Sequence, residues 1–212
     1  MEQPPEKALR RVPTQKRSRV RLEAILDAGA ELFADAGFEA TTMEAVAARA
    51  ETSIGSVYQF FPNKLALFRA IADLSFEHCR ELFGRIIPTT SLSPEDWIDV
   101  LDAAIDGFAS LQESDASVRM MWKNWNMYAE IADKDAALHR EFMDSTRALV
   151  GFVASDIPDA RRDLLATMIV EVISAMLFLT QRHPDRRKAM LEETKRMVRR
   201  YLEPELRGPS CG

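Results

Sequence analysis

The sequence contains few of the residues that build metal, redox and disulfide sites. Of its 212 residues, two are cysteine and three are histidine. Cys79 and Cys211 have no CxxC spacing, so we expect no disulfide framework and a reducing, cytoplasmic setting. His78, His139 and His183 form no HExxH pair, and the sequence has neither a P-loop nor a G-x-S-x-G motif. The sequence therefore predicts no metal site, no cofactor and no enzymatic activity.

One pair leaves a sensor role open. His78 stands directly before Cys79, which is compatible with a metal or redox sensor. Adjacent residues of a helix point about 100° apart, however, and this separation disfavours joint ligation. We therefore expect Cys79 to be a core residue and keep the sensor as an alternative.

The sequence also lacks a long uninterrupted apolar run. The longest extends from Leu164 to Leu179, and Thr167, Glu171 and Ser174 interrupt it. It is short for a bilayer-spanning helix, so we interpret it as a buried helix and expect no membrane partner. The basic N-terminal segment is not followed by an apolar segment, so we expect no secretory signal.

Charge is distributed unevenly along the chain. The net charge is −5, but residues 1–21 contain seven basic and two acidic residues, a charge of +5, which leaves −10 on the remainder. A basic end on an acidic body indicates attraction to an anion at that end, although a solvated tail has the same composition. We interpret residues 1–17 as a flexible basic arm.

Apolar residues recur at steps of three and four, and no strand alternation is sustained, so the chain is predicted to be all-α. Gly37 is expected to stop the first helix, Asn63 to cap the fourth, and Ser93 with Pro94 to start the fifth. Either Thr41, in a capping box with Glu44, or Thr42 caps the second. The nine predicted helices span about 18–36, from Thr41 or Thr42 to about 50, 54–60, 64–83, 94–112, 116–131, 134–155, 160–182 and 185–202.

The segment 41–64, TTMEAVAARAETSIGSVYQFFPNK, predicts a helix-turn-helix. Two short helices are separated by a tight turn, and the small Ala47 stands where they must approach closely. Val46, Ala50 and Val57 supply the apolar contacts between them. Each feature alone is common, and it is their order that is specific.

This order resembles the TetR family over about residues 18–72, and beyond them the resemblance is one of architecture. It implies a three-helix DNA-binding head on a larger helical body that binds a ligand and forms a dimer. The predicted domains are residues 18–84, the DNA-binding domain with the linking fourth helix, and 85–212, the ligand-binding and dimerisation domain.

The resemblance assigns DNA contacts to individual residues. Thr42, Tyr58 and Lys64 match phosphate-contacting positions of the family, and a helix N-terminus favours an anion at the first of them. The short residues that open the recognition helix allow a close approach to DNA, and two outward side chains are the candidates for base edges. The close-approach residues are Thr52, Ser53 and Gly55, and the base-contacting residues are Ser56 and Gln59.

Two basic pairs and two departures from the family complete the DNA predictions. Arg17 and Arg19 are expected to follow the DNA backbone, and Arg10 and Arg11 to reach the minor groove, unless the arm does neither. Arg49 is either a phosphate contact or a surface charge. Glu51 stands where the family often has glycine. Phe60 replaces a common phosphate-contacting histidine, and we expect it to touch a thymine methyl.

Residues 115–182 are rich in methionine and aromatic side chains, and the resemblance implies a ligand cavity in this region. A packed core has the same composition, but methionine adapts to varied shapes and a buried tryptophan needs a partner for its N–H. We expect a small apolar or aromatic effector. The predicted pocket residues are Phe108, Met121, Trp122, Trp125, Tyr128, Phe142, Met143 and Met176.

The last two helices carry wide apolar surfaces and are predicted to form the dimer, with an internal hairpin of a monomer as the alternative. The predicted interface residues are Leu165, Met168, Val172, Ala175, Leu179, Met190, Met197 and Tyr201. The predicted function is that of a homodimeric repressor that binds a palindromic operator and that an effector releases. Activation, corepression and non-specific DNA organisation remain open.

Overall fold

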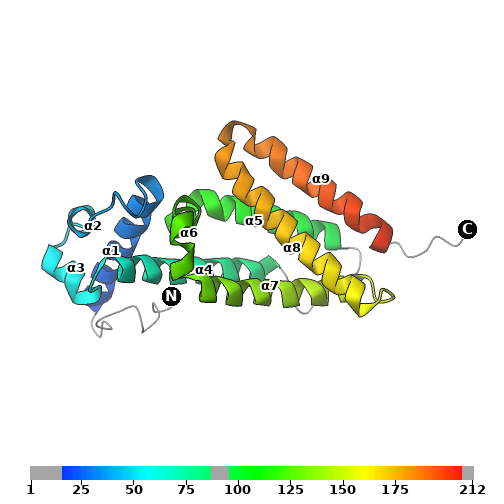
Figure 1. The fold of residues 1–212 in the computed structure, drawn as a ribbon, viewed down its shortest axis with the longest axis horizontal. Helices are drawn as coiled ribbons and strands as arrows, with labels where there is room; N and C mark the ends of the chain where they lie inside the picture. Colours follow the sequence, from blue (N-terminus) through cyan, green and yellow to red (C-terminus); the bar gives the residue numbers. More distant parts are fainter. Residues whose placement is uncertain (1–15, 87–95, 207–212) are drawn as a thin grey trace, which may run out of the picture. The chain divides into compact units, whose positions relative to one another are not determined.

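The computed structural model describes residues 16–86 and 96–206, which contain nine α-helices, two 3₁₀ helices and no strand (Figure 1). The predicted helix start at Ser93 and Pro94 lies outside the described residues, as does most of the predicted arm. The helices are α1 (Lys16–Asp35), α2 (Met43–Arg49), α3 (Ile54–Phe60), α4 (Lys64–Ile86), α5 (Trp97–Ser114), α6 (Ala116–Lys123), η1 (Trp125–Glu130), α7 (Ala132–Val153), α8 (Asp159–Arg182), η2 (Pro184–Arg186) and α9 (Arg187–Leu206).

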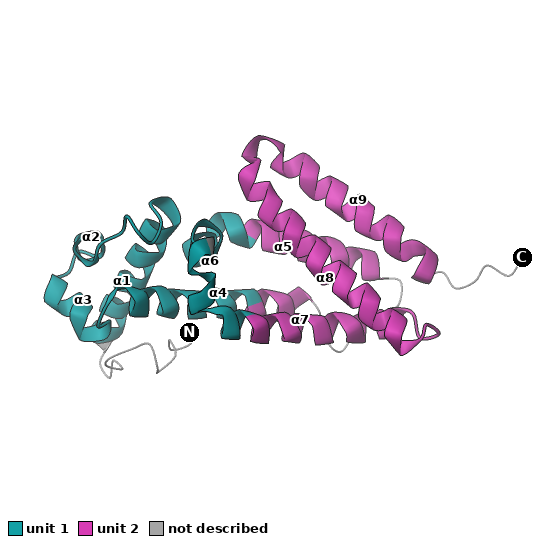
Figure 2. Cartoon of the chain, viewed as in Figure 1, with its two compact units in different colours: residues 1–79, 111–135 teal, residues 80–110, 136–212 magenta. Residues whose placement is uncertain are grey.

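The chain divides into two compact units (Figure 2). Unit 1 comprises the described residues up to Cys79 together with Leu111–Asp135. Unit 2 comprises those of Arg80–Ser110 and those from Ala136 onward. The helices α4, α5 and α7 each contribute residues to both units. The predicted assignment of DNA binding to residues 18–84 and of effector binding to 85–212 stays a prediction.

The local stop and start signals act as the sequence predicts. Gly37 has a φ of +87°, the left-handed conformation that glycine adopts freely, and α1 ends before it. Thr42 is the N-cap of α2, because its hydroxyl accepts a hydrogen bond from the Ala45 N–H at 3.1 Å. Thr41 instead donates its hydroxyl to the Gly37 carbonyl at 2.8 Å. Of the two alternatives, the capping box of Thr41 with Glu44 is therefore wrong.

The packing of α1 on α4 depends on one glycine. A Cβ atom on Gly29 would lie 2.8 Å from Cδ1 of Ile71 and 3.1 Å from Cδ2 of Leu67, closer than packed carbon atoms come. Ile25, Phe33 and Phe68 are fully or almost fully buried in the same unit. The bare backbone at Gly29 thus lets the two helices approach closely enough to bury these large side chains.

One predicted helix, 116–131, is wrong as a single element. The α-helical conformation ends at Lys123, and a 3₁₀ helix follows from Trp125 to Glu130. The residue between them, Asn124, is 3% exposed, and its side-chain amide is bonded to three backbone groups. The interruption therefore occurs where a buried polar side chain must reach partners outside its own helix.

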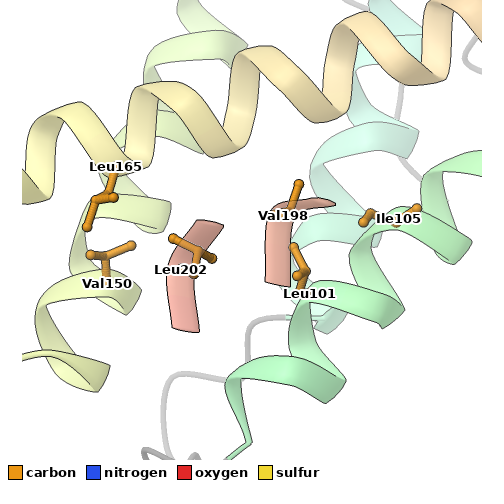
Figure 3. Packing of buried hydrophobic residues seen from close by; sticks show 6 residues of the cluster. All are labelled: Leu101, Ile105, Val150, Leu165, Val198 and Leu202. Atoms are coloured by element: carbon orange, nitrogen blue, oxygen red, sulfur yellow. The ribbon is translucent and has the colours of Figure 1, made fainter. Parts of the chain in front are cut away.

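Unit 2 is built around an apolar cluster contributed by four helices: α5, α7, α8 and α9 (Figure 3). Its buried members are Leu101, Ile105, Val150, Leu165, Val198 and Leu202. Charged pairs join α5 to α9 beside this cluster. The Lys195 ammonium lies 2.7 Å from Oδ2 of Asp106, and the Arg199 guanidinium pairs with Asp102. These contacts place α9 across α5 within unit 2.

Candidate DNA-binding and effector sites

The helices α2 and α3 form a helix-turn-helix within unit 1. The Thr52 N–H donates to the Ala47 carbonyl at 3.0 Å, which closes the turn between them. Ser53 is the N-cap of α3, with its hydroxyl accepting from the Ser56 N–H at 3.2 Å. Glu51, at the centre of the turn, has a φ of +48°, a conformation that costs a non-glycine residue about 1–2 kcal/mol. The turn therefore keeps its shape at some conformational cost.

One side of α3 faces solvent and the other faces the core. Gly55, Tyr58 and Gln59 are exposed, and Ser56 is partly exposed. Val57 is fully buried. The predicted contact residues of α3, together with the exposed Ser53 before it, thus share a polar face with a bare glycine backbone. Such a face suits entry into a major groove.

Phe60 does not belong to this face, and the expected contact with a thymine methyl is wrong for this structure. Its side chain is 3% exposed, and that of Phe61 is 0% exposed. The helix α3 ends at Phe60, and Phe61 follows in an extended conformation with φ −123° and ψ 115°. Because Phe61 is no longer on the helical period, both rings turn into unit 1.

Lys64 is placed differently from the phosphate contact that the resemblance implies. Its ammonium donates to the carbonyls of Phe38 at 2.7 Å, Thr41 at 2.9 Å and Glu39 at 3.2 Å. It also lies 4.4 Å from the centre of the Phe38 ring. An ammonium has three donors, and all are used within the chain. Lys64 therefore fastens the segment before α2 to the start of α4.

The basic residues beside the helix-turn-helix divide into two sets. Arg17 and Arg19 are exposed in the first turn of α1, as a contact with the DNA backbone requires. Arg49 is paired with Glu31 of α1, which favours the surface-charge interpretation of that residue. Arg10 and Arg11 lie outside the described residues.

Asn124 fastens α6 to the end of α1. Its Oδ1 accepts a hydrogen bond from the Phe38 N–H at 2.5 Å, and its Nδ2 donates to the Phe33 carbonyl at 3.0 Å and to the Met120 carbonyl at 2.7 Å. Lys64 contacts the same turn, because its ammonium donates to the Phe38 carbonyl. Two side chains from distant parts of the sequence thus fix the approach to α2.

Family comparison identifies the class of protein. Residues 25–71 match the model described as bacterial regulatory proteins of the tetR family. Residues 96–202 match the model described as the tetracyclin repressor-like C-terminal domain. The chain belongs to the TetR family. The resemblance that the sequence shows at residues 18–72 is thereby confirmed, as is the all-α fold with an N-terminal helix-turn-helix.

Relatives of known name are similar in the N-terminal region. The HTH-type transcriptional repressor KstR of Mycolicibacterium smegmatis is 39% identical over 59 residues, 28% of this chain and 29% of that protein. KstR of Rhodococcus jostii is 41% identical over 57 residues, 27% of each chain. The chain thus matches less than a third of the length of these relatives.

Solved structures extend the likeness to the whole fold. A regulator from Streptomyces coelicolor is 26% identical, with a TM-score of 0.59 over 88% of this chain and 99% of that one. A regulator from Rhodococcus sp. RHA1 is 22% identical, with a TM-score of 0.68 over 91% and 99%. A complex of SmeT with triclosan is 23% identical, with a TM-score of 0.62 over 83% and 90%. The latter two show the fold alone.

The predicted effector residues of this TetR-family chain fall in both units. In unit 2, Phe108 and Phe142 gather with Phe83, which sequence reasoning did not select. The Phe83 and Phe142 rings stack with centres 4.3 Å apart, and Phe108 meets Phe142 edge-on at 5.7 Å. Met143 and Met176 are partly buried in the same unit. Unit 2 therefore holds an aromatic cluster where the resemblance implies a ligand cavity.

In unit 1, the break at Asn124 removes the continuous aromatic face that the sequence predicts. Met121 and Trp122 are partly buried on α6, whereas the Tyr128 hydroxyl donates to Asp135 at 3.0 Å. The side chain of Trp125 lies outside the described part of the structure. A pocket of about 300 Å³ in unit 1 is lined by none of the predicted effector residues.

The predicted dimer residues divide between the core and the surface. Leu165 is 0% exposed in the unit 2 cluster, so its prediction as an interface residue is wrong. Val172 and Met190 are partly buried. By length and composition alone, α8 could cross a membrane, and only 22% of its most apolar stretch is buried, so the expectation that residues 164–179 form a buried helix is wrong for this structure. The exposed predicted residues are Met168, Ala175 and Leu179 of α8 and Met197 and Tyr201 of α9.

Proposed function

We propose that this TetR-family regulator is a homodimeric repressor that binds a palindromic operator through α3 and is released by a small effector. The observation that carries the proposal is the arrangement of α3, which presents Gly55, Tyr58 and Gln59 to solvent above a buried Val57. The relatives that match this region are named transcriptional repressors. The proposal includes a cytoplasmic location and no enzymatic activity.

The chemistry of the exposed α3 face defines separate roles. The Gln59 amide can both donate to and accept from a base edge, which suits adenine in the major groove. The Tyr58 and Thr42 hydroxyls can donate to phosphate oxygens, and such contacts fix position and carry no sequence information. Arg17 and Arg19 add positive charge along the backbone. Lys64 acts on the conformation of the head and makes no phosphate contact.

A second copy of the chain is the proposed partner of α8 and α9. Their exposed apolar residues, among them Met168, Leu179 and Met197, are large side chains that water solvates poorly. A dimer that covers them presents two copies of α3 to successive major grooves, roughly 34–36 Å apart. This spacing is what a palindromic operator requires.

Effector control is proposed as a coupling between this dimer and the ligand-binding region. The helix α4 begins at Lys64, which holds the turn before α2, and continues to Phe83 of the aromatic cluster. An effector that binds beside the cluster and shifts α4 changes the separation of the two α3 helices, and operator binding is lost. The proposed effector is of the expected apolar or aromatic class, which the stacked rings of Phe83 and Phe142 suit.

The test is a fluorescence-anisotropy titration of the DNA upstream of the protein's own gene, with a scrambled duplex as control. Gln59→Ala is expected to weaken operator binding about 5- to 150-fold and to reduce discrimination against the scrambled duplex. Tyr58→Phe weakens binding to both duplexes, because it removes a phosphate contact. The matched control Asn126→Ala, at an exposed amide on η1, changes neither affinity.

Equal and salt-sensitive binding to both duplexes would contradict the repressor and support a non-specific DNA-organising protein. The charge of −10 on residues 22–212 argues against that second function, since a protein that coats DNA needs a basic body.

A further inference from the structure

The pocket in unit 1 has an acidic wall that the proposed function does not use. It has a volume of about 300 Å³, at the small end of the range for ligand sites. Ala66, Arg69 and Asp73 of α4 line one side, and the segment 129–134 lines the other. All of these residues belong to unit 1.

Asp73 is the unusual member of this wall. Its residue is 6% exposed, and its Oδ1 pairs with the Lys134 ammonium. Its Oδ2 is also buried and has no hydrogen-bond partner among the described residues. Burial raises the pKa of Asp73, and the neighbouring Lys134 opposes that rise. A buried carboxylate oxygen without a donor is costly, and a ligand that supplied an N–H group would remove this cost.

The cation that already contacts Asp73 can be displaced. The Lys134 side chain is 53% exposed, so its ammonium can move into water at little cost. The other lining cation, Arg69, lies 2.5 Å from Glu130 in a pair that is also partly exposed. With Asp133 included, three carboxylates and two cations line the pocket. The excess negative charge favours a cationic ligand over a neutral or anionic one.

We propose that this pocket binds a small organic cation, an amine or amidine, whose N–H groups donate to Asp73. The ammonium of Lys134 occupies one oxygen in the free protein, and the ligand takes Oδ2 and competes for Oδ1. An amidinium fits best, because its two parallel N–H groups match the two oxygens of a carboxylate. Asp73 is the binding residue, and Lys134 is an internal competitor.

The position of the pocket gives such a ligand access to the DNA-binding head. Ala66 lies in the first turn of α4, where its N–H donates to Oδ1 of Asn63 at 2.8 Å, and it is two residues from Lys64. This link to operator affinity rests on the proposed function, whereas binding of the cation does not. The two can therefore fail independently of each other.

The test is isothermal titration of the full chain with benzamidine, and with benzamide as a neutral molecule of nearly the same shape. Benzamidine is expected to bind with one site per chain and benzamide not to bind. Asp73→Asn weakens benzamidine binding about tenfold, the equivalent of one charge-assisted hydrogen bond. Lys134→Ala tightens it by a similar factor, because the competing cation is gone. The control Lys188→Ala, exposed on α9, leaves it unchanged.

The two substitutions are expected to change benzamidine affinity in opposite directions. Misfolding of the Asp73→Asn protein could weaken its binding, but it could not explain tighter binding by Lys134→Ala. Equal binding of benzamide and benzamidine would overturn the proposal. So would the absence of benzamidine binding to both the natural chain and Lys134→Ala. Operator titrations on the same samples report separately on the proposed function.

Discussion

Replacing Asn124 tests whether its side chain is what fastens α6 to the end of α1. Asn124→Ala removes three hydrogen bonds from a residue that is 3% exposed. The Phe33 carbonyl keeps a bond from the Gly37 N–H at 3.1 Å, and the Met120 carbonyl keeps one from the Asn124 N–H at 3.0 Å. The Phe38 N–H, by contrast, loses the Asn124 acceptor, which costs about 1–3 kcal/mol.

The magnitude follows from this difference. Two ordinary hydrogen bonds at about 1 kcal/mol each and one deprived donor at about 1–3 kcal/mol give a loss of about 3–5 kcal/mol in the free energy of unfolding. Urea titration followed by circular dichroism measures it. The variant Asn124→Asp retains an acceptor for the Phe38 N–H but turns an oxygen toward two carbonyls, so it is also expected to be destabilised.

Asn126→Ala is the matched control, because Asn126 is exposed two residues further along the chain. It should change the free energy of unfolding by less than about 0.5 kcal/mol. A loss for Asn124→Ala no larger than that of the control would refute the reasoning and would show that α6 is held on α1 by apolar packing alone.

Three further predictions concern the turn, the α6 cap and the α8 surface. Glu51→Gly should raise the free energy of unfolding in urea by about 0.5–1 kcal/mol, because glycine adopts the φ of +48° without strain, whereas Ala48→Gly within α2 should lower it. Burial raises the pKa of Asp115, but hydrogen bonds from His78 and Ser117 outweigh it and lower the pKa to about 2. Asp115 therefore contributes roughly 2 kcal/mol to the free energy of unfolding above about pH 4, and this contribution is lost as the pH falls through about 2. Asp115→Asn should abolish this pH dependence. Met168→Glu should give a monomer in analytical ultracentrifugation, whereas the control Ile98→Glu, at nearly equal exposure on α5, should remain a dimer. A dimeric Met168→Glu protein would show that α8 is not part of the interface.

Features that depend on neighbouring residues could be predicted from the sequence. The stop at Gly37 and the bounds of α3 each follow from residues within one or two turns, whereas the sequence left the cap of α2 open between Thr41 and Thr42. The family is also evident from the order of such features in residues 18–72. Local backbone chemistry is enough to specify them, because a cap or a turn needs no distant partner.

Features that depend on distant residues could not be predicted. Asn124 interrupts a helix for the sake of partners 86 and 91 residues earlier, and no local pattern records them. Lys64 finds its carbonyls 23 to 26 residues back along the chain. Asp73 and Lys134, 61 residues apart, meet only in the folded chain. The sequence prediction thus failed at residues whose partners are distant in the chain.

The core and surface faces of α8 raise a different difficulty. A helix that is apolar nearly all round has no polar side to mark the exterior. Leu165 and Met168 are both predicted interface residues, yet the first is 0% exposed and the second 39%. The buried cluster that Leu165 shares with residues of α5, α7 and α9 shows which side of α8 is internal.

Hydroxyl-radical footprinting of the DNA upstream of the protein's own gene tests the central claim most directly. The account predicts two short protected half-sites on one face of the DNA, with centres about 10 base pairs, one helical turn, or a multiple of that apart. Gln59→Ala should weaken the protection of both half-sites together. Protection that is uniform along the duplex, or a single isolated half-site at saturating protein, would contradict a homodimer that reads a palindromic operator through α3.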